Sequence, residues 1–323
     1  MNSNNKNILL NHFNALAANE VEHIQTLWSG YGNISRVELL GSDISTVITK
    51  NIILPSQTNH PRGWNTDISH QRKLKSYLIE IAFYKQYASR CNNQCRVAKY
   101  HTSTSQENEH FIVLEDLDAA GFPIRKSSLD ENEIKVCLSW LAHFHAIFMD
   151  ETPSDLWNVG TYWHLATRPD ELAEMKDGKL KEVAHLIDQQ LTSCQYKTFV
   201  HGDAKVANFC FSKDLKEVAA VDFQYVGGGC GMKDVIYLLG SCMNDSECEQ
   251  NETALLNYYF SELEAALIIQ KKNIDFKSLE KEWRLLYPVA WTDFTRFLLG
   301  WMPTHNKLNN YSLKLSEQVL DSF

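Results

Sequence analysis

The chain has 323 residues, 44% of them hydrophobic and 22% charged, which is enough for a buried core of ordinary composition. Its formal net charge is −9, from 31 Lys and Arg against 40 Asp and Glu, and it has no run of basic residues, so we expect no nucleic-acid partner. No stretch reaches the roughly 18 apolar residues of a membrane span, and the polar N-terminus lacks the pattern of a secretory signal. We therefore expect a cytoplasmic protein that does not bind membranes.

The first third of the chain is predicted to be rich in strands. A short helix is expected over residues 8–18, and a polar loop with two prolines over residues 55–70. A second helix follows, because apolar residues recur at helical spacing over residues 74–82. A short apolar strand then opens the stretch 111–123, which breaks into acids and glycine. Three further strands are predicted from β-favouring runs between glycine turns: around 22–28, 33–40 and 45–54.

The rest of the chain is predicted to be mostly helical. A long helix over residues 129–149 has acids in its first turn, as the helix dipole favours. Further helices are expected over 170–193, 232–243, 251–272, 277–300 and 311–321. Because the change in pattern falls in an acidic break, we divide the chain into a β-rich N-terminal lobe, residues 1–117, and a mostly helical C-terminal lobe, residues 118–323. This layout is an α+β fold with two unequal lobes.

Two motifs in the C-terminal part place acids and an amide close together. In HGDAKVANF, Asp203 is followed by Asn208 and then by an apolar run, and in AAVDFQYVGGGCG, Asp222 ends an apolar run. Two carboxylates and an amide near the ends of strand-like segments indicate that a metal ion and a proton are handled there. The alternative for each residue alone is a turn stabilised by local hydrogen bonds.

These two motifs and FIVLEDLDAAGFP resemble the kinase-like phosphotransferases that act on small molecules, from about residue 24 to about residue 300. The resemblance is to aminoglycoside phosphotransferases, choline kinases and, most of all, the ecdysteroid-kinase-like group. It implies a two-lobed protein-kinase-like fold, with ATP and Mg²⁺ used to move the γ-phosphate to a hydroxyl of a small molecule. The sequence reads Asp-Phe-Gln where protein kinases have Asp-Phe-Gly, and no activation segment follows, so a protein acceptor is disfavoured.

The resemblance also implies roles for residues of the C-terminal lobe. Asp203 would accept the proton of the substrate hydroxyl or orient that hydroxyl, and Lys205 would reach the γ-phosphate. Asn208 and Asp222 would bind Mg²⁺. His201 would brace the loop by hydrogen bonding and take no part in the chemistry.

In the N-terminal lobe, the resemblance implies that Lys50 binds the α- and β-phosphates and pairs with Glu80 on the following helix. Ordinary surface side chains are the alternative for both residues. Gly30 and Gly32 would let backbone amides approach the phosphates, although a plain hairpin turn also explains them and the turn at 41–43 is a rival position.

The adenine edge would be bound by backbone groups of Glu115 and Leu117, in the stretch that resembles the hinge between kinase lobes. Such contacts need no particular side chain. Asp234, at the start of a predicted helix, would be a structural acid that braces the catalytic loop.

The acceptor would be bound by the helical lobe. Aromatic residues near an acid could hold a cationic amine, and the candidates are Trp163, His164, Trp291 and Asp293. Core packing is the alternative for the aromatic residues, and Arg296 is an alternative partner for the Asp293 charge. The alternative function is a catalytically inactive pseudokinase that binds a nucleotide or small molecule, and the complete acid–Asn–acid set argues against it.

Overall fold

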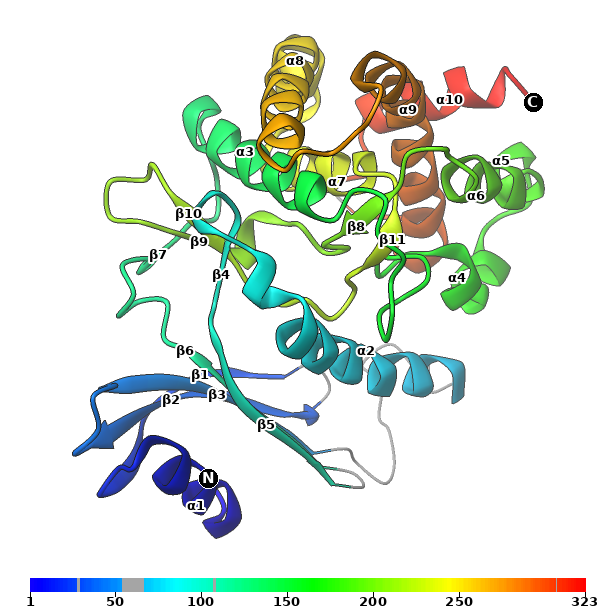
Figure 1. Ribbon diagram of the computed structural model, residues 1–323. Helices are drawn as coiled ribbons and strands as arrows, with labels where there is room; N and C mark the ends of the chain where they lie inside the picture. Colours follow the sequence, from blue (N-terminus) through cyan, green and yellow to red (C-terminus); the bar gives the residue numbers. More distant parts are fainter. Residues whose placement is uncertain (28–29, 54–66, 107–108, 306) are drawn as a thin grey trace.

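The computed structural model describes residues 1–27, 30–53, 67–106, 109–305 and 307–323 (Figure 1). Most of the loop expected over 55–70 lies outside the described residues, as do Trp28 and Leu54 at the ends of expected strands. The N-terminal lobe is an antiparallel sheet in the order β1-β2-β3-β6-β5. Its strands are β1 (Ala17–Thr26), β2 (Gly32–Leu40), β3 (Thr46–Ile53), β5 (Tyr100–Gln106) and β6 (Glu109–Glu115).

The two faces of this sheet pack against different helices. On one face, Leu9 of α1 (Ser3–Phe13) joins a small core that includes Val47 of β3. The other face is covered by α2 (Asp67–Gln86), which lies between the sheet and the C-terminal lobe (Figure 1). Because side chains alternate along a strand, Lys50 of β3 points away from α1 and toward α2, where it contacts Glu80.

The first helix is earlier in the chain than predicted. It covers Ser3–Phe13 because the Asn2 side chain caps its first turn and Asn14, in the left-handed conformation with φ of 49°, ends it. The chain then enters β1 at Ala17, so residues expected to be helical pair with β2 in the sheet.

The C-terminal lobe is mostly helical, as predicted. Its long helices are α3 (Glu131–Ile147), α7 (Met232–Cys242), α8 (Asp245–Ile269), α9 (Phe276–Trp301) and α10 (Asn310–Leu320). The helix expected over 170–193 is divided into α4 (Pro169–Glu174), α5 (Lys179–Glu182) and α6 (Ala184–Thr192). Gly178, with φ of +156°, separates α4 from α5, and Val183 separates α5 from α6. Short 3₁₀ turns are η2 (Ala88–Arg90), η3 (Asn93–Cys95), η4 (Leu165–Thr167) and η5 (Val206–Asn208). Among the described residues, no helix is long and apolar enough to cross a membrane.

Two small sheets, in the orders β4-β10-β9-β7 and β11-β8, hold the predicted catalytic motifs. Their strands are β4 (Arg96–Val97), β7 (Ile124–Arg125), β8 (Thr198–Val200), β9 (Phe209–Phe211), β10 (Val218–Ala220) and β11 (Gly227–Gly229). The β9–β10 hairpin extends beyond its strands, where the N–H of Val221 donates to the carbonyl of Asn208 at 3.0 Å. This pairing brings Asn208 next to Asp222.

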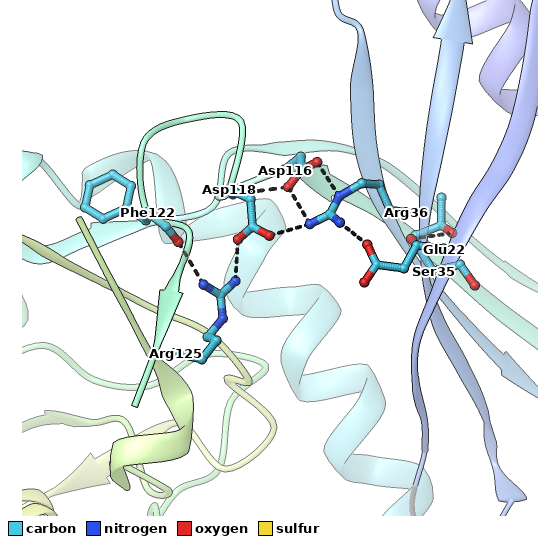
Figure 2. A network of polar contacts seen from close by, with 8 residues as sticks. Glu22, Ser35, Arg36, Asp116, Asp118, Phe122 and Arg125 are labelled. Carbon is cyan, nitrogen blue, oxygen red and sulfur yellow. Dashed lines mark hydrogen bonds and ion pairs between the residues drawn. The ribbon is translucent and has the colours of Figure 1, made fainter. Parts of the chain in front are cut away.

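A polar network joins the two lobes at the segment that follows β6 (Figure 2). Arg36 of β2 donates to Asp116 at 2.7 Å, to Asp118 at 2.5 Å and also to Glu22. Arg125 of β7 donates to the other carboxylate oxygen of Asp118 at 2.8 Å. Asp118 is therefore shared between an arginine of the N-terminal sheet and an arginine of the C-terminal lobe.

Candidate active site

Asp203 lies in the loop between β8 and β9 and is 6% exposed. Its Oδ2 accepts hydrogen bonds from Lys205 Nζ at 3.0 Å and from Asn208 Nδ2 at 3.1 Å. Burial raises the pKa of Asp203, although the Lys205 ammonium opposes the shift. A carboxylate with a raised pKa is a stronger proton acceptor than an ordinary aspartate. Oδ1 takes part in neither of these two contacts, and the Tyr237 phenol interacts with the same carboxylate.

Asp234, at the start of α7, holds the loop that carries Asp203. The Asp234 carboxylate accepts from the backbone N–H of His201 at 2.5 Å and of Gly202 at 2.9 Å, and it contacts His145 Nε2 at 3.1 Å. Gly202 has φ of +79°, and a Cβ there would lie 2.1 Å from the carbonyl oxygen of Tyr225. The tight approach of these backbones therefore requires glycine at this position.

His201 braces the same loop with both ring nitrogens. Its Nε2 donates to the carbonyl of Val221 at 3.0 Å, and its Nδ1 accepts from the backbone N–H of Asp203 at 3.2 Å. Because a carbonyl only accepts and a backbone N–H only donates, the ring is neutral with its proton on Nε2. His201 thus connects the Asp203 loop to the strand that leads to Asp222.

Asn208 and Asp222 present oxygens that lack donors. Since Asn208 Nδ2 donates to the carbonyl and carboxylate of Asp203, its Oδ1 is left without a donor among the described residues. Asp222 Oδ1 likewise has no hydrogen-bond partner in the described part of the chain, and Lys50 Nζ is 3.7 Å from it. Oxygens of this kind fit Mg²⁺. Among the described residues, no group of three or more His, Cys, Asp or Glu could hold a metal ion by itself, so Asn208 and Asp222 would supply only part of its ligands.

The structure brings Lys50 and Glu80 together in a buried ion pair. Lys50 Nζ donates to Glu80 Oε2 at 2.6 Å, and the two residues are 5% and 2% exposed. Burial acts to lower the pKa of Lys50, but the carboxylates of Glu80 and Asp222 together raise it. Lys50 is therefore a permanent cation beside the oxygens of Asp222.

Gln224 occupies the place of the protein-kinase glycine and ties the Asp222 loop to α2. Its Oε1 accepts from Lys73 Nζ at 2.9 Å and from Ser76 Oγ at 3.2 Å. Burial acts to raise the pKa of Asp222, but the ammonium groups of Lys50, Lys73 and Lys205 together hold it below its usual value. The sequence revealed the unusual glutamine but not its role, because its partners lie on a distant helix.

The glycine turn before β2 is a closed hairpin in this structure. The N–H of Gly30 donates to the carbonyl of Leu27 at 3.1 Å, and the carbonyl of Gly32 accepts from the N–H of Leu27 at 2.8 Å. Gly32 has φ of +132°, and a Cβ there would lie 1.9 Å from the carbonyl oxygen of Asn51. The positive φ and the close approach of β3 therefore explain Gly32, and a role in phosphate binding stays a prediction.

The segment after β6 contains backbone N–H groups that have no acceptor among the described residues. The Glu115 N–H donates to the carbonyl of Lys99 at 2.9 Å. The Leu117 carbonyl accepts from Phe122 N–H at 2.8 Å, whereas the Leu117 N–H has no acceptor among the residues that the structure describes. A free N–H at this place suits the edge of a purine base, and the adenine contact stays a prediction.

The sequence matches the model of the ecdysteroid kinase-like family over residues 65–156 and 158–271. The chain belongs to this family. Among solved structures, choline kinase from Cryptosporidium parvum Iowa II is similar with a TM-score of 0.52 and 11% identity, over 94% of this chain and 88% of that one. This likeness shows the two-lobed kinase-like fold.

Two aminoglycoside phosphotransferase structures align less closely, each with a TM-score of 0.44. The aminoglycoside-3'-phosphotransferase of type VIII is 14% identical over 83% of this chain and 92% of that chain. APH(3'')-Id from Streptomyces rimosus ATCC10970, in complex with ADP and streptomycin, is 11% identical over 80% and 90% of the two chains. A comparison with curated proteins finds no match.

In this member of the ecdysteroid kinase-like family, the acceptor candidates chosen from the sequence lie in the interior. Trp163, Trp291 and Asp293 are fully buried, and His164 lies 3.1 Å from the carboxylate of Asp188. Trp163 Nε1 donates to Asp293 at 3.1 Å. The charge of Asp293 is matched by Arg296, whose Nη2 donates to it at 2.8 Å. The aromatic candidates are therefore packed in the core and Asp293 is paired with Arg296, so the structure gives no support to a cationic amine held by Asp293.

Residues other than these candidates lie near Asp203. The Tyr162 and Tyr237 rings are 5.5 Å apart, and in addition to burial the Asp203 charge raises the pKa of both phenols. Lys307 Nζ lies 4.2 Å above the centre of the Tyr237 ring. Neither Tyr237 nor Lys307 could be predicted as a site residue, because Tyr237 is on the apolar helix α7 and Lys307 is in a polar loop. Only packing brings them to Asp203.

Proposed function

We propose that the chain is an ATP- and Mg²⁺-dependent phosphotransferase that moves the γ-phosphate of ATP to a hydroxyl of a small molecule. The observation that carries the proposal is the convergence of Asp203, Asn208 and Asp222 on one site, with the buried Lys50–Glu80 pair beside it. Membership of the ecdysteroid kinase-like family supports transfer to a small molecule.

The reaction breaks the bond between the γ-phosphorus and its bridging oxygen and forms a bond from that phosphorus to the acceptor oxygen. Asp203 Oδ1 takes the hydroxyl proton, while Lys205 and Asn208 hold Oδ2 and fix the carboxylate in place. ADP and the phosphorylated acceptor leave.

The phosphate end of the nucleotide would be bound by groups that are already in place. Lys50, which is kept charged by its two carboxylate neighbours, is available to the α- and β-phosphates. The free oxygens of Asn208 and Asp222 would hold Mg²⁺. When bound, Mg²⁺ neutralises negative charge on the phosphate oxygens. Lys205, which is 38% exposed at its side chain, would lie toward the γ-phosphate.

Thermal unfolding with and without ATP and Mg²⁺ tests nucleotide binding. The variants are Asp222→Asn and, as a matched control in the same hairpin, Asp214→Asn at an exposed position. Ligand at about a hundred times its dissociation constant stabilises by roughly 2.7 kcal/mol, which is about 4 °C for a chain of this length. Wild type and Asp214→Asn should show this shift, and Asp222→Asn should show a smaller one. EDTA should reduce the shift in the wild type.

A transfer assay with radiolabelled ATP and a panel of alcohols completes the test. Phosphate found on an alcohol supports the proposed function. A protein that is stabilised by ATP and Mg²⁺ but moves phosphate to neither alcohol nor water would be a nucleotide-binding pseudokinase, and the proposal would be wrong.

A further inference from the structure

Lys307 carries a positive charge near Asp203, the proposed base, and forms no ion pair with any residue that the structure describes. Its Nζ lies 4.2 Å from the centre of the Tyr237 ring and 5.7 Å from that of Phe294. Within the described ranges, this ammonium makes no hydrogen bond and no ion pair. The backbone around it is anchored, because its N–H donates to His305 Nδ1 at 3.1 Å and its carbonyl accepts from Ser312 Oγ at 3.2 Å.

The surroundings of Lys307 are poorly solvated. Burial lowers the pKa of Lys307 to about 8, even though the Asp203 carboxylate acts to raise it. The Lys205 ammonium adds to the lowering. The fold thus keeps a half-buried cation close to Asp203 without supplying it with a carboxylate. Such a group is unfavourable unless a ligand provides the missing negative charge.

The charges near Asp203 discriminate among acceptors. Lys205 pairs with Asp203 at 3.0 Å, so Asp203 compensates the positive charge of Lys307 only in part. A cationic acceptor would be repelled there. An acceptor with an oxyanion a few bonds from its reacting hydroxyl would pair with the Lys307 ammonium, while its carbon skeleton would lie against the rings of Tyr162 and Tyr237.

We propose that Lys307 recognises the acceptor, and that the acceptor is an alcohol carrying a carboxylate or another oxyanion near the reacting hydroxyl. This inference rests on the proposed function, because it concerns the substrate of the same site. It replaces the cationic amine that the sequence suggested.

The test uses matched benzyl alcohols that differ only in the para substituent: a carboxylate, a sulfonate, a neutral carboxamide and a cationic aminomethyl group. The full chain is assayed for phosphate transfer with ATP and Mg²⁺, and kcat/KM is measured for each alcohol. The variants are Lys307→Met, Lys307→Arg, and Lys314→Met as a control on α10, where the lysine is exposed and pairs with Glu249.

The wild type and Lys314→Met should prefer the anionic alcohols to the carboxamide by about tenfold or more, the usual value of a charged hydrogen bond. Lys307→Met should lose this preference mainly through KM, and Lys307→Arg should recover part of it. Preference for the aminomethyl alcohol, or equal loss of all substrates in Lys307→Met, would overturn the inference while leaving the proposed function standing.

If none of the alcohols accepts phosphate, inhibition of basal ATP hydrolysis decides. The carboxylate alcohol should inhibit hydrolysis at a lower concentration than the carboxamide, and the difference should vanish in Lys307→Met. Equal inhibition by the two alcohols overturns the inference. A nucleotide-bound protein with neither transfer nor hydrolysis overturns the proposed function, and the inference with it.

Discussion

Replacing Lys50 with methionine removes one partner of an ion pair in which both residues are buried. Lys50 and Glu80 are 5% and 2% exposed, so solvent hardly screens their 2.6 Å contact. The variant leaves the Glu80 carboxylate buried without a cation and deprives Asp222 of its neighbour at 3.7 Å. Breaking a buried pair in this way costs about 3–5 kcal/mol. At about 2.1 cal/mol/K of unfolding entropy per residue, the midpoint of thermal unfolding should fall by about 4–7 °C.

The double variant Lys50→Met with Glu80→Met separates stability from catalysis. Removing both charges leaves no unpaired ion in the contact between β3 and α2, so most of the lost stability should return, although Asp222 still lacks Lys50. Phosphate transfer should stay low, because the cation for the nucleotide phosphates is still missing. Calorimetry and transfer assays on the two single variants, the double variant and the control Lys85→Met, at an exposed position of α2, make the comparison.

The stability that Lys50→Met loses should depend on pH in one direction. Burial is the largest influence on Glu80 and raises its pKa, so without Lys50 the acid is protonated more easily in the folded state than in the unfolded state. The loss of stability in Lys50→Met should therefore grow as pH rises, because Glu80 becomes charged. It should shrink as pH falls and Glu80 becomes protonated. A single variant as stable as wild type, or a double variant no more stable than the single one, would refute this reasoning.

Three further variants test the catalytic loop and its supports. Asp203→Asn should lower turnover by about 10²–10⁴-fold in a transfer assay, while the stabilisation by ATP and Mg²⁺ persists; undiminished turnover would contradict its role as the base. Asp234→Asn presents an N–H to a site where three donors converge, so calorimetry should show a loss of about 1–3 kcal/mol together with reduced turnover. Gln224→Ala frees Lys73 and Ser76, so amide hydrogen exchange should quicken in α2, whereas Gln224→Glu should retain protection; equal exchange in both would show that the contact does not hold the helix.

The parts of the fold that depend on local pattern were predicted well from the sequence. Long amphipathic stretches correspond to helices such as α9 and α10, since many successive residues contribute to the periodic signal. The strands β4 and β7, of two residues each, could not be predicted, because pairing with distant segments alone makes them strands. The early end of α1 at Asn14 depends on a single left-handed residue, which propensity does not specify.

Within the candidate site, too, contacts between residues close in the sequence could be predicted, and contacts between distant residues could not. Asp203 and Asn208 lie in one loop, so their spacing in the sequence already implies their contact. The acceptor side is made by packing between elements far apart in the chain, and no local spacing links Tyr237 to Lys307. Asp293 was misleading because a buried acid among aromatic residues has the same sequence pattern whether its partner is a ligand or Arg296.

The shared position of Asp118 between two arginines has a mechanical consequence for the joint between the lobes. Rotation that separates β2 from β7 must break one of its ion pairs. Arg125 and Asp118 are 49% and 33% exposed, whereas Asp116, the other partner of Arg36, is only 4% exposed. Dissolved salt screens the exposed pair far more than the buried one. We therefore expect added salt to weaken the Asp118–Arg125 contact with the C-terminal lobe and so to ease rotation between the lobes. The Asp116–Arg36 contact with the N-terminal sheet should persist.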